Sequence, residues 1–438
     1  MNISELLYRK MRKYKNNVFC EDGERHISYL DYLSMVTTVC RFLKQKCQRK
    51  VLIHCQQGLN MSIGILAGLF AGKVSIPINR NLNDVLLSNI YEQINDYYEL
   101  TDRDVRECIY NSQNNSDISV NCERYPFIVF TSGTSGRFKG AELSGEGLIF
   151  NIKNIIRAVR YQAADRILIS RSLAHIAAFV GDFLAGLYKG AQFVFYDGEF
   201  IPKKISNIIQ SNKVTVWNTT PTCICAFLTG HTNISLQKCV ITGEVLTESV
   251  YKKIKTGLPR TIFYCGYGMT EASSRVSMAK LPSTIQTGYA GKILRGIKVK
   301  IVNDEIIIKS PGIMRGYIGG KRIESGWFYT NDRGKKHGRK LWVWGRKDRL
   351  IKRAGVSIDP VMIENIIQSD KYVADCKVFG KKDVFLGEKI CMQVKPMNSA
   401  VVTKEYIERL CKKYLPSYMR CNEIEICDDI KLGVTGKK

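Results

Sequence analysis

The chain has fifteen cysteines and five histidines among its 438 residues, but it lacks the spacings with which these residues bind metal ions. There is no CxxC and no HExxH, and Cys223 and Cys225 are too close together to hold one ion as a zinc knuckle does. These absences exclude the zinc-site classes that such motifs define. Because the cysteines occur singly, we interpret them as buried free thiols of a protein in a reducing cytoplasm.

Long apolar runs are also missing. The most membrane-like stretch, MSIGILAGLFAG at residues 61–72, is too short to cross a bilayer and is followed by Lys73. The first residues, MNISELLYRKMRKYKNN, contain no apolar segment of the kind that a secretory signal requires. We therefore expect a cytoplasmic protein without a membrane span, in which residues 61–72 form a buried helix.

Negative charge is scarce, since 40 Asp+Glu face 66 Lys+Arg and leave a formal net charge of +26. The cations are spread from Lys10 to Lys438, with no block of five or more like charges. A nucleic-acid binder would gather them in a patch or tail. Three explanations stay open: a lysine-rich composition that serves solubility, a diffuse field that attracts anionic ligands or an acidic partner, and nucleic-acid binding.

The order of apolar and polar segments predicts an α/β arrangement. A helix is expected at residues 28–43 behind Ser28 as a cap, and short strands at residues 50–55 and 73–78 flank the helix at 61–72. Short strands and helices continue to alternate up to about residue 289. The close-set strands that follow have glycine-rich turns and favour a β-subdomain.

A domain boundary is predicted at WGRKDRLIKRAG, residues 344–355, where charge is dense and glycines flank the segment. Asp359 and Pro360 then form a good helix start. The remaining residues are enough for a small α+β domain. The expected fold class is thus α/β and α+β: a large N-terminal domain of α/β layers plus a β-subdomain, with a small C-terminal α+β domain.

The stretch FTSGTSGRFKG, residues 130–140, directly follows an apolar run that reads as a strand. Gly133, Gly136 and Gly140 allow the main chain to approach a ligand closely, and the threonines and serines supply hydroxyl groups. Backbone N–H groups of such a loop bind phosphate oxygens, with Arg137 and Lys139 adding charge. The Walker A pattern is not matched. Loop chemistry alone leaves a phosphate site and a flexible hairpin open.

The same stretch resembles the phosphate loop of the adenylate-forming superfamily, which includes acyl-CoA synthetases, luciferases and peptide-synthetase adenylation domains. Further motifs of that family occur in the family's order: YGMTEAS at 267–273, GWFYTNDRG at 326–334, GRKDRLIKRAGVSIDPVMIE at 345–364, LPSYM at 415–419 and GVTGKK at 433–438. The chain departs from the family at Phe138, where proline is usual, at Asn331, where glycine is usual, and at Gly145, where many members have histidine.

The resemblance implies a reaction in which a carboxylic acid attacks the α-phosphate of ATP, giving an acyl-adenylate and pyrophosphate, before a thiol or amine takes the acyl group. It implies Mg²⁺ as a cofactor, and CoA or a phosphopantetheinyl carrier protein as acceptor. The N-terminal domain would cover residues 1–345, a hinge 346–349, and the mobile C-terminal domain 350–438. Asp348 matches the family's hinge position, and Gly355 would line the path of the thiol.

The resemblance also assigns the nucleotide site. The residues that would hold the β- and γ-phosphates are Thr131, Ser132, Gly133, Thr134, Ser135, Gly136 and Lys139. The residues that would lie against the adenine are Gly243, Glu244, Tyr267 and Gly268. Thr270 would donate to the α-phosphate and Glu271 would bind Mg²⁺. Asp332 would accept the ribose hydroxyls, and Arg346 would reach the same ribose or the phosphate.

Lys437 aligns with the family lysine that contacts the acyl carboxylate and the α-phosphate during adenylation, and His175 with a histidine near the acyl and thiol channels. From the residues alone, plainer readings stay open: a solvated tail for Lys437, a core histidine for His175, and turn residues for Asp332 and Gly355. These roles are therefore predictions of the resemblance.

The acid itself is less well defined. Ala177 and Ala178 stand near the point where peptide synthetases place an aspartate for the α-ammonium group, and Asp182 is out of register, which disfavours an amino acid. Small apolar residues at 176–181 fit an aryl or short acyl group. Within the superfamily, the chain looks most like o-succinylbenzoate–CoA ligase. A stand-alone enzyme that loads an acidic carrier protein, and a non-catalytic basic nucleic-acid binder of this fold, are the alternatives.

Overall fold

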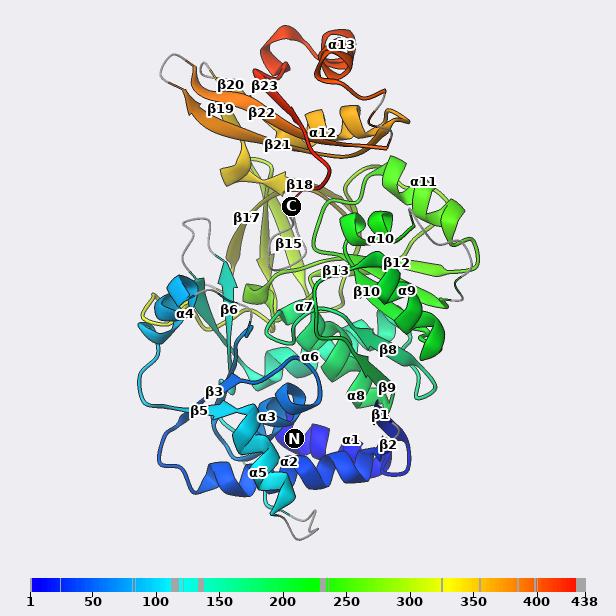
Figure 1. The fold of residues 1–438 in the computed structure, drawn as a ribbon. Coiled ribbons are helices and arrows are strands. Elements are labelled where there is room, and N and C mark those ends of the chain that lie inside the picture. The colour runs from blue at the N-terminus through cyan, green and yellow to red at the C-terminus, as the bar shows by residue number, and fades with distance from the viewer. Residues whose placement is uncertain are drawn as a thin grey trace.

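The computed structural model describes most of the chain, and within that part the strands form three sheets with helices around them (Figure 1). The described residues are 2–23, 25–80, 82, 84–111, 118–120, 122–132, 138–228, 234, 236–323, 326–353, 356–383, 386–397, 399 and 401–430. Over these residues, no helix combines the length and apolarity needed to cross a bilayer.

The first sheet has the strand order β5-β3-β4-β6-β7, parallel except for the final pair. Its strands are β3 (Lys50–His54), β4 (Val74–Pro77), β5 (Tyr97–Thr101), β6 (Phe127–Ser132) and β7 (Phe138–Leu143). The associated helices are α2 (Tyr29–Lys44), α3 (Leu59–Phe70), α4 (Asp84–Tyr91) and α5 (Asp102–Tyr110). The predicted buried helix is confirmed as α3, and the predicted cap is confirmed because Ser28 and Asp31 form a capping box at the start of α2.

The largest sheet has thirteen strands among the described residues, in the order β15-β16-β17-β18-β14-β13-β12-β11-β10-β8-β9-β1-β2. Its first eight strands in chain order are β1 (Val18–Asp22), β2 (Arg25–Ser28), β8 (Arg166–Ile169), β9 (Gln192–Phe195), β10 (Val216–Thr219), β11 (Lys238–Thr242), β12 (Ile262–Tyr267) and β13 (Ser277–Lys280). Strands β8 to β12 are parallel, and their helices include α6 (Gly145–Val159), α9 (Pro202–Ser211), α10 (Pro221–Leu228) and α11 (Glu248–Gly257).

The strands expected to form a separate β-subdomain are antiparallel, and they extend the large sheet through β13. They are β14 (Tyr289–Ile293), β15 (Lys298–Val302), β16 (Glu305–Lys309), β17 (Phe328–His337) and β18 (Lys340–Arg346). Figure 1 shows β17 and β18 running towards the smaller C-terminal part of the molecule.

The C-terminal part has a sheet and a core of its own, which confirms a small α+β unit. Its elements are β19 (Ile351–Arg353), β20 (Val356–Ile358), α12 (Pro360–Gln368), β21 (Val373–Asp383), β22 (Gly387–Pro396), α13 (Lys404–Tyr414), η4 (Ser417–Met419) and β23 (Glu423–Ile426). Asp359 caps α12 by accepting from the backbone N–H of Val361, and Pro360 follows, so this predicted helix start is confirmed. The predicted hinge, residues 346–349, falls on the short η3 (Lys347–Arg349) between β18 and β19.

All fifteen cysteines are free, as predicted, but their burial is uneven. Nine are buried, five are partly exposed, and Cys47 lies at the surface. Burial raises the pKa of the Cys239 thiol well above its usual value, which makes that thiol unreactive at neutral pH. The prediction of buried thiols is therefore wrong for Cys47 and correct for the majority.

Candidate active site

Two of the predicted nucleotide-binding segments follow neighbouring parallel strands. Strands β11 and β12 are paired up to Thr242 opposite Gly266. Gly243 and Glu244 come directly after β11, and Tyr267 is the last residue of β12. Because the carboxyl ends of parallel strands lie at one edge of a sheet, these segments lie side by side, at the position where open α/β sheets bind ligands.

The Glu244 side chain is oriented by the first turn of α10. One of its carboxylate oxygens, Oε2, accepts hydrogen bonds from the Thr222 backbone N–H at 3.1 Å and from the Thr222 hydroxyl at 2.7 Å. Gly243 beside it has a φ of +95°, in the region that favours glycine. The Gly-Glu turn is thus a defined structural feature of this edge.

Gly268 is required by the close return of the chain after β12. A Cβ atom built on Gly268 would lie 1.7 Å from the backbone oxygen of Ser274. The return is held by the backbone N–H of Ser274, which donates to Met269, and by that of Val276, which donates to Tyr267. Only glycine fits this position, and the turn presents η2 (Thr270–Ala272) at the sheet edge.

Three predicted site residues lie close together on three strands of the large sheet. Tyr267 is the last residue of β12, and Asp332 of β17 pairs with Arg346 at the end of β18. The Tyr267 hydroxyl donates to Asp332 Oδ2 at 2.5 Å, and Arg346 Nη1 lies 3.9 Å from Asp332 Oδ1. Burial, and then the charge of Asp332, raise the pKa of Tyr267 well above its usual value, so its hydroxyl stays protonated and donates. The structure therefore brings together three residues that lie 65 and 14 positions apart in the chain.

Glu271 is held by a residue that the sequence interpretation did not assign to the site. The Tyr317 hydroxyl donates to Glu271 Oε1 at 2.6 Å, and Lys139 Nζ lies 5.5 Å from the centre of the Tyr317 ring. Burial, and then the charge of Glu271, raise the pKa of Tyr317, which keeps it a donor. Tyr317 thus links predicted residues from β7 and η2. In the sequence, the Gly316-Tyr317 pair was the one feature that could have pointed to Tyr317 as a site residue.

The loop of residues 133–137 lies outside the described residues, but its two ends are well defined. Thr131 pairs with Lys139, and Ser132 with Phe138, across the antiparallel strands β6 and β7. The backbone N–H of Phe138 donates to Asn89 Oδ1 at 2.9 Å, and its carbonyl accepts from Gln93 at 2.8 Å. A proline at position 138 has no N–H to make the first bond, so this departure from the family has a structural reason.

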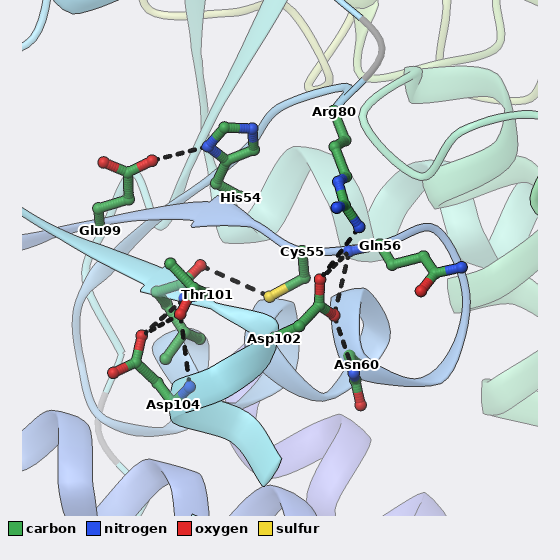
Figure 2. Close-up of polar contacts among 10 residues, drawn as sticks. His54, Cys55, Gln56, Asn60, Arg80, Glu99, Thr101, Asp102 and Asp104 are labelled. Carbon is green, nitrogen blue, oxygen red and sulfur yellow. Dashed lines mark hydrogen bonds and ion pairs between the residues drawn. The ribbon is translucent and has the colours of Figure 1, made fainter. Parts of the chain in front are cut away.

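A second polar cluster fixes the neighbouring loops at the carboxyl edge of the first sheet (Figure 2). Asp102 accepts hydrogen bonds from the Gln56 backbone N–H at 3.0 Å and from Asn60 at 2.8 Å, and it lies 3.6 Å from Arg80. These partners follow β3 and β4, while Asp102 follows β5. One carboxylate thus holds together three loops of the sheet that also carries the β6–β7 hairpin.

The remaining predicted residues divide into two groups. Thr270 begins η2 and is half-buried, and His175 precedes the short helix α7 (Ile176–Ala178). The residues that lie outside the described part are Gly133, Thr134, Ser135, Gly136, Gly355 and Lys437, and the side chain of Asp348 is not described either.

Comparison with known proteins identifies the class. The AMP-binding enzyme family matches residues 93–318, more than half of the chain, and its C-terminal domain matches residues 362–437. This chain belongs to the AMP-binding enzyme family, which confirms the resemblance that the ordered motifs predicted.

Individual relatives are more distant. A 4-coumarate–CoA ligase of Humulus lupulus is 28% identical over 340 residues, covering 70% of this chain and 62% of the relative. This chain thus spans less than two thirds of that relative's length. Among solved structures, an anthranilate CoA ligase in complex with anthranoyl-AMP has a TM-score of 0.86 at 18% identity, covering 100% of this chain and 95% of the other.

An o-succinylbenzoate CoA synthetase from Bacillus subtilis has a TM-score of 0.81 at 19% identity, covering 99% of this chain and 96% of the other. At such identities, the two structural matches establish the mixed α/β fold with a large N-terminal and a smaller C-terminal domain. The predicted similarity to o-succinylbenzoate–CoA ligase is therefore supported for the fold alone. The substrate of the present chain is a matter for proposal.

Proposed function

We propose that this protein is an ATP-dependent acid–thiol ligase that works through an acyl-adenylate. A carboxylate oxygen of the substrate attacks the α-phosphorus of ATP, and the bond from that phosphorus to pyrophosphate breaks. The sulfur of a thiol then attacks the acyl carbon, AMP leaves with the electrons of its C–O bond, and the thiol proton passes to solvent. The proposed acceptor is CoA, with a phosphopantetheinyl carrier protein as the alternative.

The observation that carries the proposal is the group of Tyr267, Asp332 and Arg346 beside Glu271 at the carboxyl edge of the large sheet. Asp332 is only 7% exposed, and the Tyr267 hydroxyl orients its carboxylate. A fixed carboxylate is a suitable acceptor for two ribose hydroxyls, and the neighbouring guanidinium neutralises phosphate charge. Gly243, Glu244 and Gly268 supply the adjacent wall for the adenine.

Glu271 fits the proposed magnesium site. It offers a hard carboxylate oxygen, and among the described residues no group of three or more His, Cys, Asp or Glu side chains could form a complete cage. A single protein carboxylate, with phosphate oxygens and water, is the usual environment of Mg²⁺. The bound ion would neutralise phosphate charge, and Tyr317 would hold the Glu271 carboxylate in place.

Charge neutralisation would come from residues far apart in the chain. We assign Thr131, Lys139 and the loop residues 132–136 to the departing phosphates, and Thr270 to the α-phosphate. Lys437 would bridge the attacking carboxylate and the α-phosphate, where a compact ammonium group stabilises the crowded anionic transition state. The positive net charge of +26 supports an anionic substrate or an acidic partner.

The two half-reactions need different arrangements of the C-terminal domain. We propose that residues 350–438 deliver Lys437 for adenylation and then rotate about the hinge at 346–349, which contains Asp348. The thiol would then enter past Gly355, with His175 near the acyl end. The separate core of the C-terminal part supports movement as a rigid unit.

The names of the relatives favour an aryl acid. One curated relative is a ligase of 4-coumarate, and one matching structure contains anthranoyl-AMP. Small residues at 177, 178 and 181 beside the site are compatible with an aromatic ring. We therefore propose an aryl or arylalkyl carboxylic acid as substrate.

Isotope exchange between pyrophosphate and ATP, screened over a panel of aryl and acyl acids, tests the adenylation step. CoA, a carrier protein and amines would then be compared as acceptors by product analysis. The proposal expects exchange that depends on both an acid and Mg²⁺. A protein that binds nucleotide but gives no exchange with any acid would refute it, and salt-dependent DNA binding without ATP turnover would favour the nucleic-acid alternative.

Lys437→Ala tests the role assigned to Lys437, and Lys438→Ala is a matched control one position away. We expect Lys437→Ala to lower the exchange rate at least about 100-fold, since a single preorganised charge contributes on that order. Thioester formation from a supplied acyl-adenylate should stay within a few-fold of the wild type. Exchange at wild-type speed in Lys437→Ala would refute this assignment alone.

A further inference from the structure

Behind the candidate nucleotide edge lies a buried cluster of charged groups that the proposed chemistry does not use. Arg171 follows β8, Asn218 is in β10, Asp182 is in the π-helix η1 (Phe179–Leu184), and Arg275 follows η2. Thr242, the last residue of β11, joins the cluster by donating to Asn218 Oδ1 at 3.2 Å. Five separate segments thus place polar groups in one location.

The only carboxylate of the cluster among the described residues is Asp182, which is 2% exposed. Asn218 Nδ2 donates to its Oδ1 at 2.6 Å, and Arg171 Nη2 lies 3.8 Å from its Oδ2. Burial raises the pKa of Asp182 to about 6, so it is mostly ionised at neutral pH. Asp182 therefore offsets one positive charge.

The cluster contains two guanidinium groups and is left with an excess positive charge. Arg275 is 3% exposed, and burial, and then the charge of Arg171, lower the pKa of Arg275 to about 10, so it is still charged at neutral pH. Its Nε and Nη2 have no hydrogen-bond acceptor among the described residues, and the same holds for Nε and Nη2 of Arg171. Each buried donor left without an acceptor costs about 1–3 kcal/mol. Stability alone does not account for such an arrangement.

The cluster borders the proposed acyl site. Thr242 directly precedes Gly243, and Arg275 lies four residues after Glu271. A Cβ atom built on Gly181 would lie 3.0 Å from Arg275 Nη2 and 3.7 Å from Asn218 Nδ2, so a larger residue at 181 would crowd the guanidinium. Gly181, the last of the small residues predicted to line the acyl site, therefore lies against the guanidinium of Arg275.

Arg171 is held in place from the other sheet. Gln57, in the loop between β3 and α3, donates from Nε2 to the Arg171 carbonyl at 3.0 Å, and its Oε1 accepts from the Leu173 backbone N–H at 2.8 Å. The Gln57 side chain therefore fixes the backbone of this segment at two points, Arg171 and Leu173. A preorganised cation of this kind binds an anion without reorganisation.

We infer that Arg275 and Arg171 bind a second carboxylate of the acid substrate, at the end remote from the carboxyl group that is activated. The inference rests on the proposed function and narrows its substrate class to dicarboxylic acids. A carboxylate accepts two parallel hydrogen bonds from a guanidinium, which would satisfy the donors of Arg275 and cancel the excess charge. Arg275 and Arg171 would then determine specificity, while activation takes place at the nucleotide.

Matched pairs of acids test this inference in the pyrophosphate exchange assay. The pairs are phenylacetate with homophthalate, and hexanoate with adipate, which differ by one carboxylate. The wild type is expected to prefer the dicarboxylate by at least about tenfold in kcat/KM, as a charge-assisted contact provides. Equal use of both members of each pair by an active enzyme would overturn the inference and leave the proposed function intact, whereas a lack of exchange with any acid would refute both.

Arg275→Met and Arg275→Lys separate a binding role from a structural one. The methionine variant should lose the preference for dicarboxylates while its kcat/KM with monocarboxylates stays within a few-fold, and the lysine variant should keep part of the preference. Arg260→Met, at an exposed arginine of the same domain, is the control and should keep the full preference.

Stability provides a second measurement. Because Arg275→Met removes a buried charge without a full complement of partners, its Tm should equal or exceed that of the wild type. Homophthalate should raise the Tm of the wild type more than phenylacetate does, and this difference should vanish in Arg275→Met. A lower Tm together with an unchanged substrate preference would show that Arg275 is structural and would overturn the inference.

Discussion

The hydrogen bond between Tyr267 and Asp332 can be tested by removing a single oxygen atom. Tyr267→Phe keeps the ring and its packing but deletes the hydroxyl that donates to Asp332 Oδ2 at 2.5 Å. Asp332 is 7% exposed, so solvent cannot fully replace the lost donor. The nearby Arg346, 3.9 Å away, offers an ion pair at longer range.

The expected loss follows from the charge and burial of the acceptor. A hydrogen bond to a charged group contributes about 1.5–3 kcal/mol, and a buried acceptor left without its donor falls in the same range. We therefore expect Tyr267→Phe to lower the free energy of unfolding of the N-terminal part by about 2 kcal/mol. The affinity for nucleotide should fall as well, because the Asp332 carboxylate loses its orientation.

Urea unfolding followed by tryptophan fluorescence provides the assay, since Trp342 and Trp344 lie on β18 beside Arg346. Tyr329→Phe is the matched control, because Tyr329 is on β17 with Asp332 but is 66% exposed. The control should change stability by less than about 0.5 kcal/mol. Equal, small effects of both variants would refute the reasoning.

A pH series extends the test. The pKa of Tyr267 is raised in the folded state, so the stability it provides is fully present below its unfolded value of about 10 and is lost as the pH rises above that value. The stability gap between the wild type and Tyr267→Phe should therefore be constant up to about pH 10 and narrow above it.

Three further predictions concern other parts of the site. Gly268→Ala should prevent stable folding or nucleotide binding, because its Cβ would lie 1.7 Å from the Ser274 carbonyl oxygen; soluble yield and circular dichroism would measure this. Tyr317→Phe should raise the Mg²⁺ concentration for half-maximal exchange several-fold, because Glu271 loses a donor at 2.6 Å; unchanged Mg²⁺ dependence would contradict the link. Burial raises the folded pKa of Asp182 to about 6, so its protonation favours the folded state as the pH falls. From pH 7 to 5 the wild type should gain about 1.4 kcal/mol over Asp182→Asn in urea unfolding.

Much of the fold could be predicted from local sequence because its signals are local. The Ser28 cap, the Asp359-Pro360 helix start and the buried helix α3 each depend on residues within one or two turns. The union of the antiparallel strands with the parallel ones could not be predicted, since it depends on pairing between β13 and β14 and between β14 and β18. Such pairing is set by tertiary contacts.

The site shows the same division. Motifs could single out Tyr267, Glu271 and Asp332 as candidates, because each lies in a distinctive stretch of sequence. Tyr317 and Arg275 could not be assigned a role from the motifs. Glu271, which accepts the hydrogen bond of Tyr317, lies 46 positions away, and Arg171, the other guanidinium of the buried cluster, lies 104 positions from Arg275 and outside the motifs. Nothing in the sequence around Arg275, shortly after YGMTEAS, indicates that this arginine is buried. A role for Arg275 becomes evident only from Asp182 and Arg171, which surround it in the structure.

The attachment of Phe138 to helix α4 has a mechanical consequence. Where the family motif quoted above usually has a proline ring, the start of β7 in this protein depends on two side chains of the α4 region, Asn89 and Gln93. A covalent ring restrains the chain at every temperature, but a short surface helix opens at a lower free-energy cost than the core does. Heat, a crosslink or an antibody acting on α4 would therefore act directly on the end of the β6–β7 hairpin, and through it on the proposed nucleotide affinity.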